Sequence, residues 1–228
     1  MKPLLVFDLD GTLVDSRADL VVSANEMLGM YNAGPLKDDA VAGFVGDGAR
    51  MLVARSIVAA GVPATDLNEA LATFLEIYHR RLLETTTPYP GIPEILERAS
   101  ASGVAMGIVT NKPVKPTFTI LHHFGLARHF TWVVGGDGEF ARKPDPAGLT
   151  WMIAEAGADG SSTLFIGDSQ IDADTARAAR AQFCLAAYGF GQARGIVSLQ
   201  PGEYYAKSAE GVARAIAAVA AIDTGGAV

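Results

Sequence analysis

Two pairs of aspartates carry the strongest chemical signal in the sequence. Asp8 and Asp10 follow an apolar run near the N-terminus, and Gly11 permits a tight turn that brings the second carboxylate back over the first. Asp168 and Asp172 follow a later apolar run and face one point if a helix begins between them. Singly, each aspartate could cap a helix or close a turn. Together, carboxylates without cysteine or histidine predict a hard-cation site, and Mg²⁺ is its natural occupant.

Polar and basic residues that suit a phosphate group follow two further apolar runs. The stretch Thr110-Asn111-Lys112-Pro113 offers a hydroxyl, an amide and, at a predicted helix start, backbone N–H groups for anionic oxygens. Lys143 follows the other run, within reach of the same sheet edge. Its alternative role is that of an exposed lysine ahead of a proline-led helix. These residues predict an anion site beside the carboxylates.

Five short apolar runs predict the strands that position these side chains. They are near-continuous rather than alternating, as in strands covered on both faces. The runs are Leu4–Leu9, Val104–Thr110, Thr131–Val134, Thr163–Gly167 and Phe183–Ala187. In open parallel sheets ligands bind outside the carboxyl ends of the strands, which is where the polar residues above are expected.

Helical patterns lie between most of these runs. They span Pro93–Ser100, Pro116–Phe124, Pro146–Ala156 and Asp172–Ala181. Glycines are predicted to end the first three: Gly103, Gly125 and Gly157. The alternation of strand and helix predicts an α/β fold with a Rossmann-like parallel sheet and helices on both faces.

The segment from residue 16 to residue 85 differs from the rest, because no convincing strand pattern occurs in it. It reads as amphipathic helices over Arg17–Met30, Lys37–Phe44, Gly48–Ala60 and Thr65–Glu84. Turns rich in glycine and proline separate them. We therefore expect residues 1–15 and 86–228 to form an α/β core, and residues 16–85 to form a helical domain inserted after the first strand.

The overall composition excludes several classes of protein. The 228 residues include 18 basic and 25 acidic side chains, for a formal net charge of −7, and half of the residues are hydrophobic. This excludes a disordered chain and argues against partners such as nucleic acid or an anionic membrane, which need a basic patch. The one cysteine, Cys184, cannot form an intramolecular disulfide, and no stretch is apolar enough to span a bilayer. We expect a cytoplasmic protein, either a monomer or a homodimer.

These motifs resemble those of a known enzyme family. Four of them resemble, in order, the motifs of the haloacid dehalogenase superfamily: Asp8–Ser16, Thr110, Lys143-Pro144 and Gly167–Asp172. Four more stretches resemble the phosphoglycolate phosphatase branch of that superfamily: Phe44–Gly48, Gly107–Pro113, Val133–Asp137 and Tyr188–Gly191. The helical insertion is similar to the C1-type cap domain of this branch. The resemblance covers nearly the whole chain.

The resemblance implies a phosphomonoester hydrolase that works through an aspartyl-phosphate. Asp8 would be the nucleophile that attacks phosphorus. Asp10 would be the general acid that protonates the leaving alkoxide, and then the base that activates water. An acid at position 10 favours phosphoryl chemistry, because dehalogenases of the superfamily generally lack one there. The implied substrate is 2-phosphoglycolate or a similar small phosphorylated metabolite.

The resemblance also implies binding roles, with Mg²⁺ as the cofactor. The metal ligands would be the carboxylates of Asp8 and Asp168, the backbone carbonyl of Asp10 and, in or beside this set, Asp172. The phosphoryl group would be bound by Gly11, Thr110, Asn111 and Lys143. Gly46 and Arg50, in the helical insertion, are the expected contacts to the non-phosphate end of the substrate. Arg50 has the equal alternative of a solvent-exposed or salt-bridged helix residue.

Other functions stay open at this point. A phosphomutase similar to β-phosphoglucomutase shares the motifs, and only analysis of the products separates it from a phosphatase. A phosphatase of broad specificity for sugar or nucleotide phosphates shares them too. A non-catalytic binding module is a remote alternative, because every motif position is filled.

Overall fold

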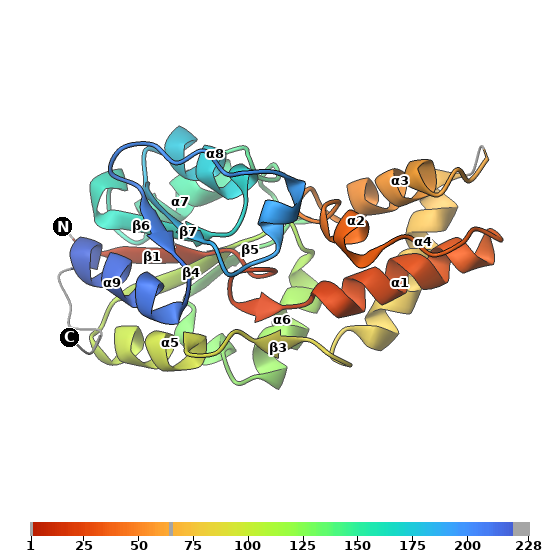
Figure 1. Ribbon diagram of the computed structural model, residues 1–228. Coiled ribbons are helices and arrows are strands. Elements are labelled where there is room, and N and C mark those ends of the chain that lie inside the picture. The colour runs from red at the N-terminus through yellow and green to blue at the C-terminus, as the bar shows by residue number, and fades with distance from the viewer. Residues whose placement is uncertain (1, 64–65, 221–228) are drawn as a thin grey trace.

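The computed structural model describes residues 2–63 and 66–220. Its centre is a six-stranded sheet in which all neighbouring strands pair in parallel, in the order β5-β4-β1-β6-β7-β8 (Figure 1). The strands are β1 (Leu4–Phe7), β4 (Ala105–Val109), β5 (Trp132–Val134), β6 (Thr163–Gly167), β7 (Gln182–Ala186) and β8 (Tyr204–Ala206). The predicted α/β class with a parallel sheet is confirmed.

The edge strand β8 was not expected from the sequence. It is only three residues long, and Tyr205 in its middle is half exposed, so no buried apolar run marks it. Its pairing with β7 comes from the tertiary fold. The other five strands lie within two residues of the predicted runs at each end.

Helices cover both faces of the sheet, because β1 sends alternate side chains to opposite sides. Leu5 and Phe7 belong to a core with apolar residues of α5, α6 and α9, whereas Leu4 and Val6 belong to a second core with residues of α7 and α8. These helices are α5 (Ile92–Ala101), α6 (Val114–His123), α7 (Ala147–Glu155), α8 (Gln170–Ala178) and α9 (Ala209–Ala220). The predicted layers on both faces are therefore present.

Local signals at the helix ends explain where these helices stop and start. The residues predicted to end helices adopt positive φ just after α5, α6 and α7: Gly103, Gly125 and Gly157. Helix α8 begins at Gln170, earlier than the predicted start at Asp172, because Ser169 caps it. This earlier start places Asp172 in the first turn of α8.

Four helices form a separate cluster beyond the carboxyl ends of the strands (Figure 1). They are α1 (Arg17–Met30), α2 (Asp38–Ala42), α3 (Ala49–Ala59) and α4 (Leu67–Arg81). Each falls on a predicted helical pattern, although α2 is shorter than expected. Thr65, where the fourth helix was predicted to begin, lies outside the described residues. We call these four helices, together with the loops between them, the helical cluster.

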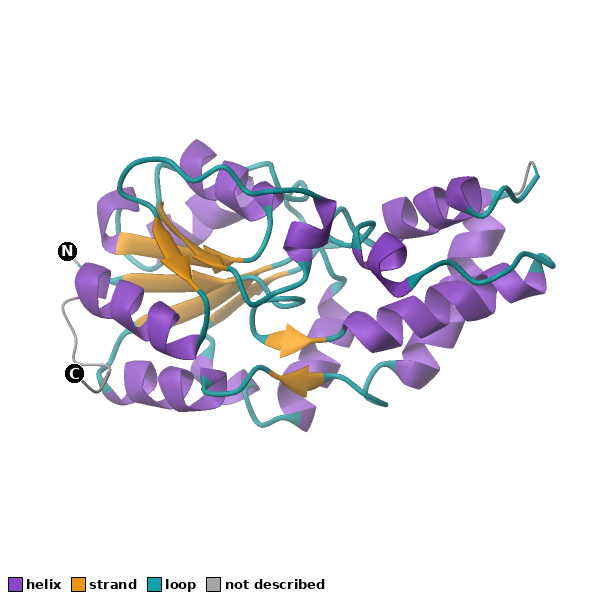
Figure 2. Cartoon of the chain, viewed as in Figure 1, coloured by secondary structure: helices purple, strands orange, loops and turns teal. Residues whose placement is uncertain are grey.

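A short antiparallel ribbon joins the helical cluster to the rest of the chain (Figure 2). The chain leaves through β2 (Val14–Asp15) and returns through β3 (Thr87–Pro88). The ribbon lies at the predicted boundaries of the insertion, and the division into two domains stays a prediction. Over residues 2–63 and 66–220, no helix is long and apolar enough to cross a membrane.

A buried carboxylate fastens the two connections to each other. Asp19, in the first turn of α1, is 2% exposed and accepts hydrogen bonds from the backbone N–H and the hydroxyl of both Thr85 and Thr86. The donor–acceptor distances run from 2.6 to 3.2 Å. Thr86 is buried, so removing the carboxylate would leave its N–H and hydroxyl without a hydrogen-bond partner, at a cost in stability.

We expect Asp19→Ala to lower the free energy of unfolding by about 3 kcal/mol or more, because it breaks a buried hydrogen-bond network. Urea unfolding followed by circular dichroism measures the change. The control is Glu76→Ala, which removes an exposed carboxylate from α4 that pairs only at the surface with Arg80. If Asp19→Ala lowered the free energy of unfolding no more than Glu76→Ala does, the proposed role of Asp19 in fastening the two connections would be contradicted.

Candidate active site

Polar residues gather at the carboxyl edge of the sheet. Asp8 follows β1, Thr110 follows β4 and Asp168 follows β6, and β1 lies between the other two strands. The backbone N–H of Asp8 donates to the carbonyl of Ile166 at 2.9 Å, which continues the pairing of β1 with β6 by one residue. Three segments far apart in the sequence therefore deliver polar side chains to one place.

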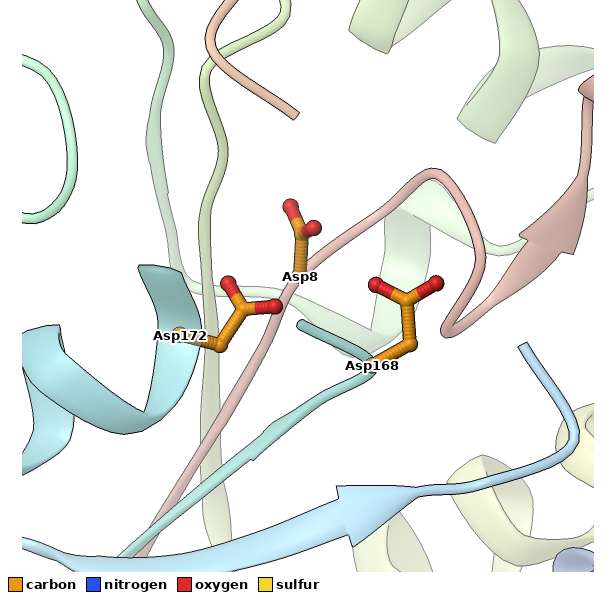
Figure 3. Close-up of side chains that lie close together, drawn as sticks. All are labelled: Asp8, Asp168 and Asp172. Carbon is orange, nitrogen blue, oxygen red and sulfur yellow. The ribbon is translucent and has the colours of Figure 1, made fainter. Parts of the chain in front are cut away.

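Three buried carboxylates converge there: Asp8, Asp168 and Asp172 (Figure 3). One oxygen of each lies within 4.8 Å of the others. Burial raises the pKa of Asp8 to about 6, while the charge of Lys143 opposes the rise and that of Asp172 adds to it. Burial, and then the charges of Asp172 and Asp8, raise the pKa of Asp168 well above its usual value. This cluster needs compensating positive charge.

Lys143 supplies part of that charge. Its Nζ lies 2.8 Å from Asp8 Oδ1 and 2.6 Å from Asp172 Oδ1, and its side chain is 3% exposed. Burial alone would lower the pKa of Lys143, but Asp172 and Asp8 raise it, so the ammonium stays charged. One ammonium leaves the three carboxylates short of positive charge.

Asp172 is both part of this cluster and part of a helix cap. Its Oδ2 accepts from the backbone N–H of Ser169 at 3.0 Å and from the Ser169 hydroxyl at 2.6 Å, completing a capping box at the start of α8. Its Oδ1 accepts from Lys143. Asp172 therefore fixes the position of Lys143 as well as adding negative charge.

Asp168 is enclosed by close backbone contacts. Its Oδ2 accepts from the N–H of Gly191 at 2.7 Å. Gly11 has a φ of +84°, and a Cβ at this position would lie 1.9 Å from Asp168 Oδ2. A Cβ at Gly189 would lie 2.1 Å from the carbonyl oxygen of Gly11. Gly11 therefore packs against Asp168 and does not belong to the described lining of the cavity beside the site.

The carboxylate of Asp10 lies with Lys112 rather than in the cluster. Lys112 Nζ is 3.0 and 3.1 Å from the two Asp10 oxygens, and the Ser16 hydroxyl donates to Oδ1 at 2.6 Å. Lys112 is buried and also donates to the Tyr78 hydroxyl at 2.5 Å. The Asp10 side chain is thus held away from the cluster. Its backbone carbonyl is the group that the family resemblance implies as a metal ligand.

Sequence reasoning assigned no role to Lys112. The one feature of the sequence that could have indicated a role for Lys112 is its position after Thr110 and Asn111, at the end of a buried strand. Its partner Asp10 is 102 residues away in the sequence, so the pairing could be found only in the folded chain.

The side chain of Asn111 serves the scaffold instead of facing a phosphate. Its Oδ1 accepts from the backbone N–H of Lys143 at 2.9 Å. Its amide donates to the carbonyls of Lys143, at 3.1 Å, and Gly46, at 2.8 Å. Asn111 therefore positions the Lys143 backbone and ties the loop before α3 to the sheet edge. Thr110 and the backbone remain for the predicted anion contacts.

A cavity lies between the strand ends and the helical cluster. The strand ends contribute its charged and polar lining: Asp8, Asp10, Thr110, Asn111, Lys112, Lys143 and Asp168. The helical cluster contributes mainly apolar side chains: Leu20, Val45, Leu52, Phe74 and Leu75. Gly46 and Tyr78 also line it, which brings the predicted Gly46 to the cavity.

Arg50 is not brought to this cavity, which corrects the expected substrate contact. Its side chain is exposed and donates to Asn68 at 2.8 Å, between α3 and the start of α4. The cause is helical geometry, because Arg50 follows Ala49 and points to a different face of α3 from the residues that line the cavity. The exposed helix residue, its alternative role, is what the structure shows.

The residues of this site fit a hard divalent cation such as Mg²⁺. The donor set is oxygen only, contributed by Asp8, Asp168 and Asp172, and one oxygen of each lies within 4.8 Å of the others. Burial and, after it, the charges of neighbouring carboxylates raise the pKa of Asp8 and Asp168, and a cation would stabilise both carboxylates. A cation, the Lys143 ammonium and the Thr110 hydroxyl can together bind an anion beside the carboxylate of Asp8.

Comparisons with known proteins agree with this chemistry. Residues 5–186 match the family model described as haloacid dehalogenase-like hydrolase. Phosphoglycolate phosphatase 1 of Pseudomonas aeruginosa is 36% identical over 202 residues, covering 87% of this chain and 74% of the relative. Phosphoglycolate phosphatase of Rhodospirillum rubrum is 38% identical over 196 residues, covering 83% and 81%.

A solved structure is similar over nearly its whole length. The crystal structure of a predicted phosphoglycolate phosphatase from Haemophilus somnus 129PT has a TM-score of 0.88 and 29% identity, covering 94% of this chain and 97% of the other. The similarity therefore includes the helical cluster as well as the sheet. Because the family match also spans every strand that carries a residue of this site, the chain belongs to the haloacid dehalogenase-like hydrolase family.

Proposed function

We propose that the protein is a Mg²⁺-dependent phosphomonoester hydrolase that acts on 2-phosphoglycolate or a similar small phosphorylated metabolite. The observation that carries the proposal is the separation of two neighbouring carboxylates. Asp8 lies beside Lys143 in the carboxylate cluster, while Asp10 lies outside it with Lys112. The names of the curated relatives support the choice of substrate.

Asp8 is the proposed nucleophile. One of its carboxylate oxygens attacks phosphorus, the bond from phosphorus to the ester oxygen breaks, and an aspartyl-phosphate forms. Lys143 and the Thr110 hydroxyl hold the phosphoryl oxygens in line for this step. When bound, Mg²⁺ would neutralise negative charge on the phosphoryl oxygens. Its ligands would be Asp8, Asp168 and the Asp10 carbonyl, with Asp172 beside them.

Asp10 is the proposed general acid and base. It gives a proton to the leaving ester oxygen, and later removes a proton from the water that attacks the aspartyl-phosphate. That second attack releases inorganic phosphate and restores Asp8. Lys112 and Ser16 hold this carboxylate outside the cluster, which leaves it available for proton transfer rather than metal binding.

The helical cluster, residues 16–85, is the proposed cap domain over a core of residues 1–15 and 86–228. Its apolar side chains cover the cavity and would exclude bulk water from the reaction. The hydrogen bonds from Asn111 to Gly46 and from Lys112 to Tyr78 are among those that join it to the strand ends.

A panel of phosphoesters tests the proposed function. We expect kcat/KM for phosphate release from 2-phosphoglycolate to exceed that for glucose 6-phosphate and AMP by about tenfold or more, because the apolar cavity lining leaves the extra hydroxyls of larger substrates unpaired. Equal values would favour a broad-specificity phosphatase instead. Transfer of the phosphoryl group between positions of a sugar, without phosphate release, would favour a phosphomutase.

A further inference from the structure

Among the hydrogen-bond donors that line the cavity, the Tyr78 hydroxyl has no acceptor among the described residues. Tyr78 comes from α4 of the helical cluster, is 6% exposed, and lines the cavity. Its hydroxyl lies 2.5 Å from Lys112 Nζ. An ammonium can only donate, so the Tyr78 oxygen is the acceptor and its own hydrogen must point elsewhere. No oxygen or nitrogen of residues 2–63 and 66–220 accepts that hydrogen.

The surroundings hold this donor in place. The Tyr78 ring stacks on Phe74, with centroids 5.7 Å apart and an interplanar angle of 13°. Lys112 is fixed on its other side by both oxygens of Asp10. Burial raises the pKa of Tyr78 to about 12, so the phenol keeps its proton at neutral pH. A buried donor held so firmly is expected to have an acceptor in the bound state.

The chemistry of the cavity narrows what that acceptor is. Around Tyr78 the helical cluster lines the cavity with apolar side chains such as Leu20, Leu52 and Phe74, so the acceptor comes from the ligand. The ammonium of Lys112, hydrogen-bonded to the same hydroxyl, favours an anionic oxygen over a neutral one. Lys112 also contacts Asp10, which places the hydroxyl only two hydrogen bonds from the proposed general acid.

We propose that Tyr78, backed by Lys112, is the subsite for a carboxylate on the leaving group of the substrate. The subsite rests on the proposed function, because Asp10 marks where the ester oxygen lies. A carboxylate one carbon from that oxygen, as in 2-phosphoglycolate, reaches Tyr78 while the rest of the small leaving group stays against the apolar wall. The class of substrate is therefore a short phosphorylated 2-hydroxy acid.

The test compares two phosphoesters that differ in the carboxylate alone. 2-Phosphoglycolate and ethyl phosphate both have a two-carbon leaving group. We expect Tyr78→Phe to lower kcat/KM for 2-phosphoglycolate by about 10- to 100-fold, the effect of one hydrogen bond to a charged group. We expect ethyl phosphate to change by less than about threefold, because its leaving group offers no oxygen for Tyr78.

The matched control is Tyr31→Phe, which removes a hydroxyl from the residue after α1, outside the described cavity lining. It should leave both substrates unchanged. An equal loss on both substrates in Tyr78→Phe, or no loss on either, would overturn the subsite. Failure of the wild-type enzyme to hydrolyse either phosphoester would overturn the proposed function itself, which is a separate and visible result.

Discussion

Replacing Asp8 by asparagine is expected to lower kcat for phosphoester hydrolysis more than about a thousandfold, because the variant has no carboxylate oxygen to attack phosphorus. The exchange keeps the size of the side chain. It also removes one of three crowded buried carboxylates, whose pKa values are raised by burial and mutual repulsion. We therefore expect the melting temperature of the variant to stay at the wild-type value or to rise.

Steady-state release of phosphate, measured beside thermal unfolding, tests this expectation. The matched control is Asp174→Asn, which makes the same change of charge on the exposed side of α8 and should retain wild-type kcat. Acid quenching of the wild-type enzyme during turnover should also trap phosphate on the protein, and the Asp8 variant should trap none. An Asp8→Asn enzyme with near wild-type activity would rule out Asp8 as the nucleophile.

Removal of divalent metal is expected to lower activity more than about a hundredfold, and added Mg²⁺ should restore it. The reason is the charge of the site. Four carboxylates, of Asp8, Asp10, Asp168 and Asp172, lie in or beside the site, and two ammonium groups, of Lys112 and Lys143, oppose them. A phosphoester adds further negative charge, so without a cation the substrate is repelled from the nucleophile.

Chelation with EDTA, gel filtration and titration with Mg²⁺ measure this effect. The binding of Mg²⁺ can also be measured without an activity assay. A ligand that binds only the folded protein raises its melting temperature, so thermal unfolding reports Mg²⁺ binding. We expect Asp168→Asn to need a higher Mg²⁺ concentration for both readouts, and Asp174→Asn to behave as wild type. Activity that survives thorough chelation would contradict the metal assignment.

Much of the core of the site follows from local sequence patterns. Asp8 and Asp168 end buried apolar runs, and in a parallel sheet such ends meet at one edge. Gly11 was expected at a tight turn, and its positive φ confirms that. The wider reason for that glycine, the contact with Asp168 157 positions later in the chain, could not be seen locally.

Other residues changed their role once the chain was folded. Asn111 has an amide side chain of the kind that binds phosphate. Both polar atoms of this side chain nevertheless hydrogen-bond to backbone groups of Lys143 and Gly46. Arg50 has the charge of a substrate contact, yet it lies exposed beside Asn68. Residue type states what a side chain is able to bind, whereas its rotamer and neighbours determine what it does bind.

By itself, the sequence determined the α/β class, the helical insertion and the aspartates that could hold a cation. These depend on periodicity, on turn residues and on the order of polar residues at strand ends, all of which act over short stretches. Only the tertiary structure decided that Asp10 pairs with Lys112, that Lys112 meets Tyr78, and that Asp172 holds Lys143. Each of these contacts joins segments that are distant in sequence, and packing of the whole fold is what brings them together.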